Sequence, residues 1–194
     1  MPSLKSSLFT RRFAIGVALT LALSVAAVVW TKQSQEIANY NLLAASSAGD
    51  LAAAALLLRR GAQINSRFGG EGQTALHRAA AQNEVQMVKF LLDHGADPNV
   101  ADADGNTPLL VTAYKGHLEV ALLLIAAKAD LDVAESRYGI TPLMEAARKG
   151  HVELVGMLLA AGANRASTTK DGRTARELAL SGGNIAIAEM LASR

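Results

Sequence analysis

The chain has 194 residues, of which 51% are hydrophobic and only 4% aromatic, and its formal net charge is +2. This length fits one domain and a short appendage, and the abundance of Ala and Leu, strong helix formers, predicts an all-helical protein. Cysteine is absent, which excludes a disulfide framework and a thiolate zinc site. From position 33 onward there are 15 basic and 17 acidic residues, which argues against a general binder of the nucleic-acid backbone.

Residues 1–32 form a leader of the export type. They contain four basic residues and no acidic one, and residues 13–30 are uncharged. A cleaved signal peptide would use an apolar stretch of about residues 13–23 and the small residues near Ala26 as its cleavage site. A retained signal anchor would use the whole apolar run, with Trp30 at the membrane interface. Both alternatives predict that the chain after about residue 31 is delivered outside the cytoplasm, either to the periplasm or to an inner-membrane anchor.

The rest of the chain repeats itself with a period of 33 to 34 residues. Four threonines mark the copies, and each follows a glycine at the same offset: Thr74, Thr107, Thr141 and Thr174. A fifth, degenerate copy precedes them and contains the segment Leu42-Leu43-Ala44-Ala45. Repeats of this length cannot bury their apolar faces alone, so the pattern predicts a stack of repeats.

The hallmark segments of these repeats resemble the ankyrin repeat. Examples are Gly105-Asn106-Thr107-Pro108-Leu109 and Gly116-His117-Leu118-Glu119-Val120, and the resemblance covers residues 39–194. It implies an all-α solenoid of about five helix-turn-helix repeats with β-hairpin tips, preceded by one N-terminal hydrophobic helix. The expected solenoid domain spans residues 33–194. Its repeats are expected at about residues 39–71, 72–104, 105–138, 139–171 and 172–194.

Local signals agree with this architecture. Thr is a favoured helix N-cap and Pro fits the first helical turn, so Thr107-Pro108 predicts the start of a helix. Lys128 replaces the helix-ending glycine in the third repeat and is expected to be mildly strained. In the last repeat, Arg176-Glu177 replaces the usual Leu-His pair, which suits a terminal repeat with a polar outer side.

No residue pattern predicts catalysis. Ser, His and Asp do not occur in a nucleophile elbow, and Gly69–Gly72 lacks the Lys-Ser/Thr of a phosphate loop. The histidines occupy repeat positions and are interpreted as structural: His77, His94, His117 and His151. Asp102 and Asp104 fall in a hairpin tip. We therefore expect no enzyme activity, no catalytic residue, no cofactor and no metal.

The resemblance places partner binding on the hairpin tips and the exposed ends of the first helices. On this strip basic residues outnumber acidic ones, and Tyr and Arg are enriched at interface hot spots. The candidate partner-binding residues are Tyr114, Lys115, Arg137, Tyr138, Ile140, Arg148, Lys149, Lys170 and Arg173. The expected partner is another protein with an acidic patch, not nucleic acid, and the membrane is contacted only through an uncleaved leader. The alternative is a solvated face without a partner.

These inferences predict a protein–protein interaction module in a bacterial cell envelope. Two alternatives share the fold and differ in the partner, namely an inhibitor or immunity-type protein and a scaffold for an exported enzyme. A cryptic hydrolase is the least favoured, because it needs a nucleophile and a base in one pocket. An inhibitor would depend on one or two Tyr or Arg anchors, whereas a scaffold would tolerate many single substitutions.

Overall fold

The computed structural model describes residues 27–192, which form a helical solenoid as expected. The chain enters this part in a helix over residues 27–47, here called the leading helix. The helices that follow are α2 (Leu51–Arg59), α3 (Ala75–Ala81), α4 (Val85–Asp93), α5 (Pro108–Lys115), α6 (Leu118–Ala126), α7 (Pro142–Lys149), α8 (Val152–Ala160), α9 (Ala175–Ser181) and α10 (Ile185–Ala192).

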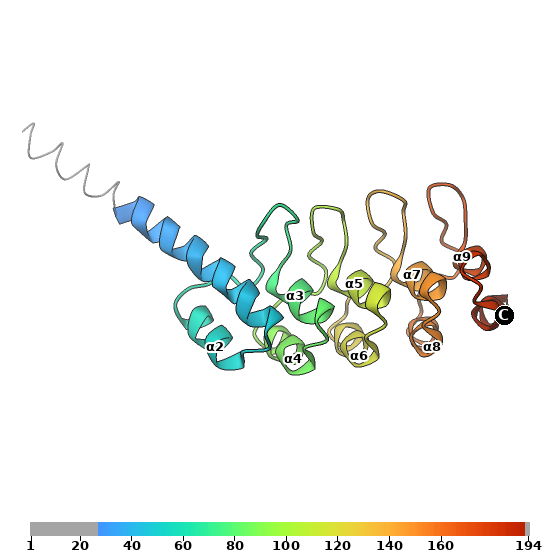
Figure 1. Ribbon diagram of the computed structural model, residues 1–194, viewed down its shortest axis with the longest axis horizontal. Coiled ribbons are helices and arrows are strands. Elements are labelled where there is room, and N and C mark those ends of the chain that lie inside the picture. Colours follow the sequence, from blue (N-terminus) through green and yellow to red (C-terminus); the bar gives the residue numbers. More distant parts are fainter. Residues whose placement is uncertain (1–26, 193–194) are drawn as a thin grey trace, which may run out of the picture.

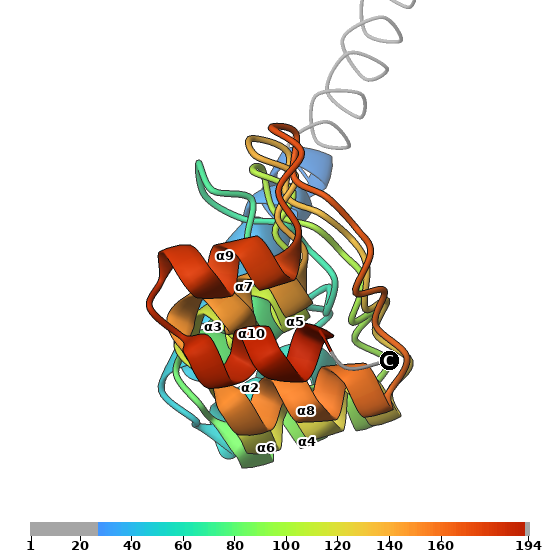
Figure 2. The same cartoon turned by 90° about the vertical axis from the view of Figure 1, so that its right-hand side faces the viewer.

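The helices pair into repeats that stand side by side along the long axis of the molecule (Figure 1). The first helices α3, α5, α7 and α9 contact one another in sequence order, and the second helices α4, α6, α8 and α10 form the other layer (Figure 2). The loops between repeats project to one side as hairpins. In the described residues their β-structure is limited to the isolated bridges Phe68↔Gln73 and Thr168↔Thr174.

Threonine N-caps start the first helices, as the sequence predicts. The side chain of Thr107 accepts a hydrogen bond from the Leu110 backbone N–H at 3.3 Å, and Pro108 occupies the first helical position. Thr141 and Pro142 repeat this arrangement. Each cap satisfies a backbone N–H that has no partner within the helix, which is worth about 1 kcal/mol.

The core is built from small and aliphatic side chains that recur at the same repeat position. Ala79 and Ala113 on the first helices are fully buried, and so are Leu91 and Leu124 on the second helices. Alanine lets neighbouring first helices approach closely, while each leucine buries enough apolar surface to contribute about 2 kcal/mol. Stacking therefore supplies the stability that one repeat lacks.

Polar side chains also link successive repeats. Asn65 Oδ1 accepts a hydrogen bond from the Asp97 backbone N–H at 2.9 Å, and Asn99 Oδ1 accepts one from the Asp130 N–H at 2.7 Å. His117 Nε2 lies 3.3 Å from the Ala81 carbonyl oxygen at the end of α3. Its position agrees with the structural role expected for the histidines of the turns.

The expected strain at Lys128 is present. This residue has a φ of 66°, in the left-handed region that glycine tolerates best, and Asn83 has a φ of 60° in the second repeat. Gly116 and Gly150 end α5 and α7 with the same left-handed backbone. The two non-glycine residues therefore occupy turns where their Cβ atoms are unfavourable.

The leading helix crosses the expected boundary at residue 32 without a break. Its C-terminal half packs on the first repeat, where Leu42 is buried and Asn39 Oδ1 accepts a hydrogen bond from the Gln63 N–H at 2.7 Å. Its N-terminal half is exposed, including Val29 and Trp30. Most of the predicted leader lies outside the described residues. Within residues 27–192, no helix is long and apolar enough to span a membrane.

Candidate partner-binding groove

A surface hollow of about 350 Å³ lies between α5, α7 and the two hairpin loops beside them. We call it the groove. It is lined by residues from the third and fourth repeats: Asn106, Leu110, Val111, Tyr114, Glu135, Tyr138, Ile140, Glu145 and Arg148.

Helical spacing brings the residues of α5 and α7 to the groove. Val111 and Tyr114 are three residues apart on α5, and Glu145 and Arg148 are three residues apart on α7, so each pair shares one helix face. Because α5 and α7 are direct neighbours, the two faces lie together. The groove is therefore a consequence of stacking and not of one repeat alone.

The hairpin loops form a wall held by the backbone. The Ser136 N–H donates to the Asp104 carbonyl at 2.8 Å, and the Lys170 N–H donates to the Tyr138 carbonyl at 2.8 Å. Within its loop, the Glu135 N–H donates to the Ile140 carbonyl at 3.0 Å. These bonds fix the loop that carries Tyr138 between its two neighbours, so the backbone of the loop loses little conformational freedom on binding.

Glu145 and Arg148 form an internal ion pair in the groove. The Arg148 Nη2 donates to Glu145 Oε1 at 2.6 Å, and its Nε donates to Oε2 at 3.1 Å. The Glu145 side chain is 5% exposed and that of Arg148 38%. The hydrogen bond to Glu145 raises the pKa of the Arg148 guanidinium, so Arg148 stays ionised.

Glu135 is also satisfied within the protein. Burial alone raises the pKa of its carboxyl, but backbone N–H groups of Arg137, Tyr138, Ile140 and Gly139 together lower it more. The Arg137 N–H donates at 2.6 Å and the Ile140 N–H at 3.2 Å. The carboxylate therefore organises the hairpin tip.

Three cations lie over the tyrosine rings at the rim. Lys149 Nζ is 4.1 Å and Lys115 Nζ 5.7 Å from the centre of the Tyr114 ring, and the Arg137 guanidinium is 5.0 Å from that of Tyr138. Tyr114 is 47% exposed and Tyr138 53%. None of these cations belongs to an ion pair in the described part of the chain.

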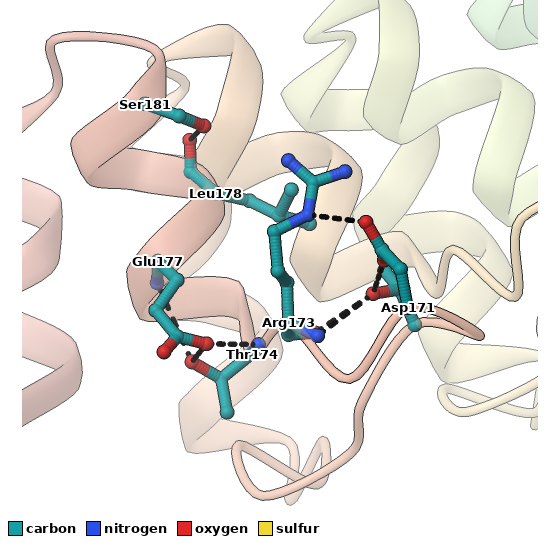
Figure 3. Close-up of polar contacts among 7 residues, drawn as sticks. Asp171, Arg173, Thr174, Glu177, Leu178 and Ser181 are labelled. Atoms are coloured by element: carbon teal, nitrogen blue, oxygen red, sulfur yellow. Dashed lines mark hydrogen bonds and ion pairs between the residues drawn. The ribbon is translucent and has the colours of Figure 1, made fainter.

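Lys170 and Arg173 lie on the next hairpin, outside the lining of the groove. Arg173 Nε donates to Asp171 Oδ2 at 2.8 Å, and Lys170 Nζ donates to the Ser136 carbonyl (Figure 3 shows the Arg173 contact). The hydrogen bond from Thr169, followed by those from Arg173, lowers the pKa of the Asp171 carboxyl. Nearby, the Thr174 N–H donates to Glu177 at 2.7 Å, which gives the unusual Arg176-Glu177 pair a capping role.

The structure thus brings together part of the predicted strip. Four of the predicted residues line the groove, namely Tyr114, Tyr138, Ile140 and Arg148. Lys115, Lys149 and Arg137 were also predicted and lie over its tyrosine rings. Four further lining residues were not predicted from the sequence, namely Leu110, Val111, Glu135 and Glu145. Glu145 could have been found from the sequence, because it lies three positions before Arg148, which is the spacing of an ion pair on one helix face.

A metal site is not apparent in the described residues, because no three His, Asp or Glu side chains converge there. His77 illustrates the reason. Its Nδ1 accepts a hydrogen bond from the Thr74 N–H at 3.2 Å, and its Nε2 lies 2.9 Å from the Asn106 carbonyl oxygen. Both ring nitrogens are occupied by the backbone of adjacent repeats.

The family model described as ankyrin repeats (3 copies) matches residues 42–135 and 125–194. The chain belongs to the ankyrin-repeat family. Ankyrin repeats are protein–protein interaction modules, and proteins built from them are generally non-enzymatic scaffolds.

Curated relatives share short stretches of this repeat. The chain is 39% identical over 71 residues to the potassium channel AKT3 of Oryza sativa subsp. japonica, which covers 37% of this chain and 8% of the channel. It is 45% identical over 62 residues to the Notch-regulated ankyrin repeat-containing protein of Xenopus tropicalis, and 44% identical to that of Homo sapiens. Both of these matches cover 32% of this chain and 54% of the relative. The similarity therefore extends to the repeats and not to whole proteins.

Proposed function

We propose that this chain is a non-catalytic module that binds one partner protein through the groove between α5 and α7. The observation that carries the proposal is the pair Tyr114 and Tyr138, two half-exposed aromatic side chains that flank an apolar hollow. Backbone hydrogen bonds hold the loop that carries Tyr138 to both neighbouring loops. Aromatic anchors beside a small pocket are typical of interface hot spots. Ankyrin-family membership supports a protein as the ligand.

The site of action that we propose is the cell envelope of a bacterium. The support is the leader of residues 1–32, with its basic start and its uncharged run over residues 13–30. On this proposal, the repeat domain lies outside the cytoplasm, free in the periplasm or tethered by the leader to the inner membrane. If the leader is retained, the proposed contact with the membrane is made through it.

Of the two roles considered from sequence, the groove favours an inhibitor or immunity-type protein over a broad scaffold. The exposed tyrosines of the strip gather at one hollow, so one or two substitutions should abolish binding. A scaffold would spread its contacts over more of the solenoid. An acidic patch on the partner would meet the cations above the tyrosine rings.

Affinity capture from envelope extract tests the proposed function. The bait is the full chain, compared with a Tyr114→Ala/Tyr138→Ala double variant. Tyr40→Ala is the matched control, because Tyr40 is an exposed tyrosine that lies on the leading helix and rests against Phe68 with ring centres 5.5 Å apart. One protein captured by the wild type and the control, and lost by the double variant, supports the proposal. Equal capture by the wild type, the control and the double variant contradicts the proposal.

A further inference from the structure

Both carboxylates in the groove are already engaged by the protein itself. Glu145 is held by Arg148 through two hydrogen bonds, and Glu135 by the backbone N–H groups of its own loop. A carboxylate with such partners gains little from a second cation. The groove is therefore poorly suited to select a basic segment of a partner.

The cations at the rim, in contrast, lie over aromatic rings and belong to no ion pair within residues 27–192. Lys149 and Lys115 lie over Tyr114, and Arg137 lies over Tyr138. A cation–π contact at an exposed site is weak, so these groups are positioned above the groove but remain available to a ligand that binds them more strongly. A carboxylate that approaches from solvent is such a ligand, because it forms charge-assisted hydrogen bonds with Lys and Arg.

The floor of the groove is apolar and small. Leu110, Val111 and Ile140 contribute aliphatic surface, and the volume of about 350 Å³ is near the lower end of the range of about 300–1,000 Å³ typical of ligand pockets. A hollow of this size accommodates one large apolar side chain of a partner.

Resting on the proposed function, we infer that the groove binds an acidic segment of the partner. One large apolar side chain of that segment enters the hollow between Tyr114 and Tyr138. Asp or Glu residues close to it in the same segment contact Lys149 and Arg137. The leader of this chain does not fit the description, because residues 1–32 carry basic residues and no acidic one.

Single-stranded nucleic acid is the competing ligand, because bases also stack on tyrosine beside Lys and Arg. The apolar lining favours the acidic peptide. Leu110, Val111 and Ile140 can surround an apolar side chain, whereas the polar edge of a base would lose its hydrogen bonds to water there.

Selection from a phage-displayed library of random 12-residue peptides tests the inference, with the purified full chain kept in mild detergent as the target. Enriched peptides are expected to combine Leu, Ile, Phe or Trp with Asp or Glu within two or three positions. Enrichment of basic or uncharged peptides, or of none, overturns the inference. The proposed function is tested separately by capture of the partner, so failure of the acidic-segment inference can be distinguished from failure of the proposed function.

A synthetic copy of the enriched peptide then tests the contacts. Charge reversal by Arg137→Glu/Lys149→Glu is expected to weaken its binding by a factor of about ten or more, since like charges then face each other. The matched control is Arg59→Glu/Arg60→Glu at the far end of α2, which makes the same change in net charge and is expected to leave affinity within about twofold. Equal losses in both variants contradict a specific site. Binding of a 12-residue oligothymidylate as tightly as the peptide also overturns the inference, in favour of nucleic acid.

Discussion

Arg148 holds both carboxylate oxygens of Glu145, three residues earlier on α7, at 2.6 and 3.1 Å. Glu145 is nearly buried, whereas Arg148 reaches solvent at the groove. The pair therefore affects both the stability of the fourth repeat and the charge at the groove. One repeat later, the position of Glu145 is occupied by the buried Leu178. The solenoid therefore accepts either an ion pair or an aliphatic side chain at this place.

Removal of one partner from this pair should destabilise the protein. Arg148→Ala leaves the Glu145 carboxylate buried without its charged hydrogen bonds, so the free energy of unfolding is expected to fall by about 1–3 kcal/mol. The partial exposure of Arg148 keeps the value below that of a fully buried pair. Urea denaturation followed by circular dichroism measures the change.

The double variant Glu145→Leu/Arg148→Ala is the matched control for that experiment. It replaces the carboxylate by the residue found at position 178, so most of the lost stability should return. If the double variant were less stable than Arg148→Ala, a net stabilising role of Glu145 beyond the pair would follow, and this account of α7 would be wrong.

Lys128→Gly is expected to stabilise the protein by about 0.5–1 kcal/mol. Lys128 has a φ of 66°, and glycine adopts that backbone without a Cβ clash. The midpoint of thermal unfolding reports the gain. Gly116→Ala provides the contrast, because a Cβ at this left-handed residue would lie 2.5 Å from a carbon of the His151 ring, and it should destabilise. Loss of stability in Lys128→Gly would contradict the assigned strain.

Stability should decrease in mildly acidic solution because of His77. Burial lowers the pKa of this imidazole, against the smaller opposing effects of the Asn106 carbonyl and Asp102. The unfolded chain therefore takes up a proton near pH 6.5 while the folded chain does not, so the free energy of unfolding falls as the pH drops below about 6.5. The fall ends once the pH passes below the folded-state pKa.

Urea denaturation between pH 5 and pH 8 measures this contribution. His77→Leu is the informative variant, since the third repeat has Leu110 at the equivalent position. It should be less pH-sensitive than the wild type over this interval, whatever its absolute stability. Identical pH dependence in both proteins would show that other groups control acid sensitivity.

The periodic part of the fold could be predicted because each repeat position has one physical requirement. Thr107 caps a helix, Pro108 fits its first turn and Gly116 ends it, and these requirements are local. The departure at Lys128 was visible for the same reason, since the other copies show which residue the turn prefers.

The groove was only partly predictable because its geometry arises between repeats. Tyr114 and Tyr138 were expected on an exposed strip, but the sequence did not show that Leu110 and Val111 form a hollow between them. The sequence also did not show which basic side chains of the strip are already paired with an acidic one. Arg148 was expected to face a partner, whereas Glu145 already engages it. Lys115, Lys149 and Arg137 lie over tyrosine rings and belong to no ion pair in the part of the chain that the structure describes.

Site-specific photo-cross-linking in living cells tests the central claim, that the groove is the partner-binding site. The photoreactive residue p-benzoylphenylalanine replaces Val111 in the groove or, as control, Leu122 on α6, an exposed aliphatic residue that does not line it. The account predicts one discrete adduct from position 111 and none from position 122. An adduct formed only from position 122 would contradict it and would place the interface on the second-helix layer.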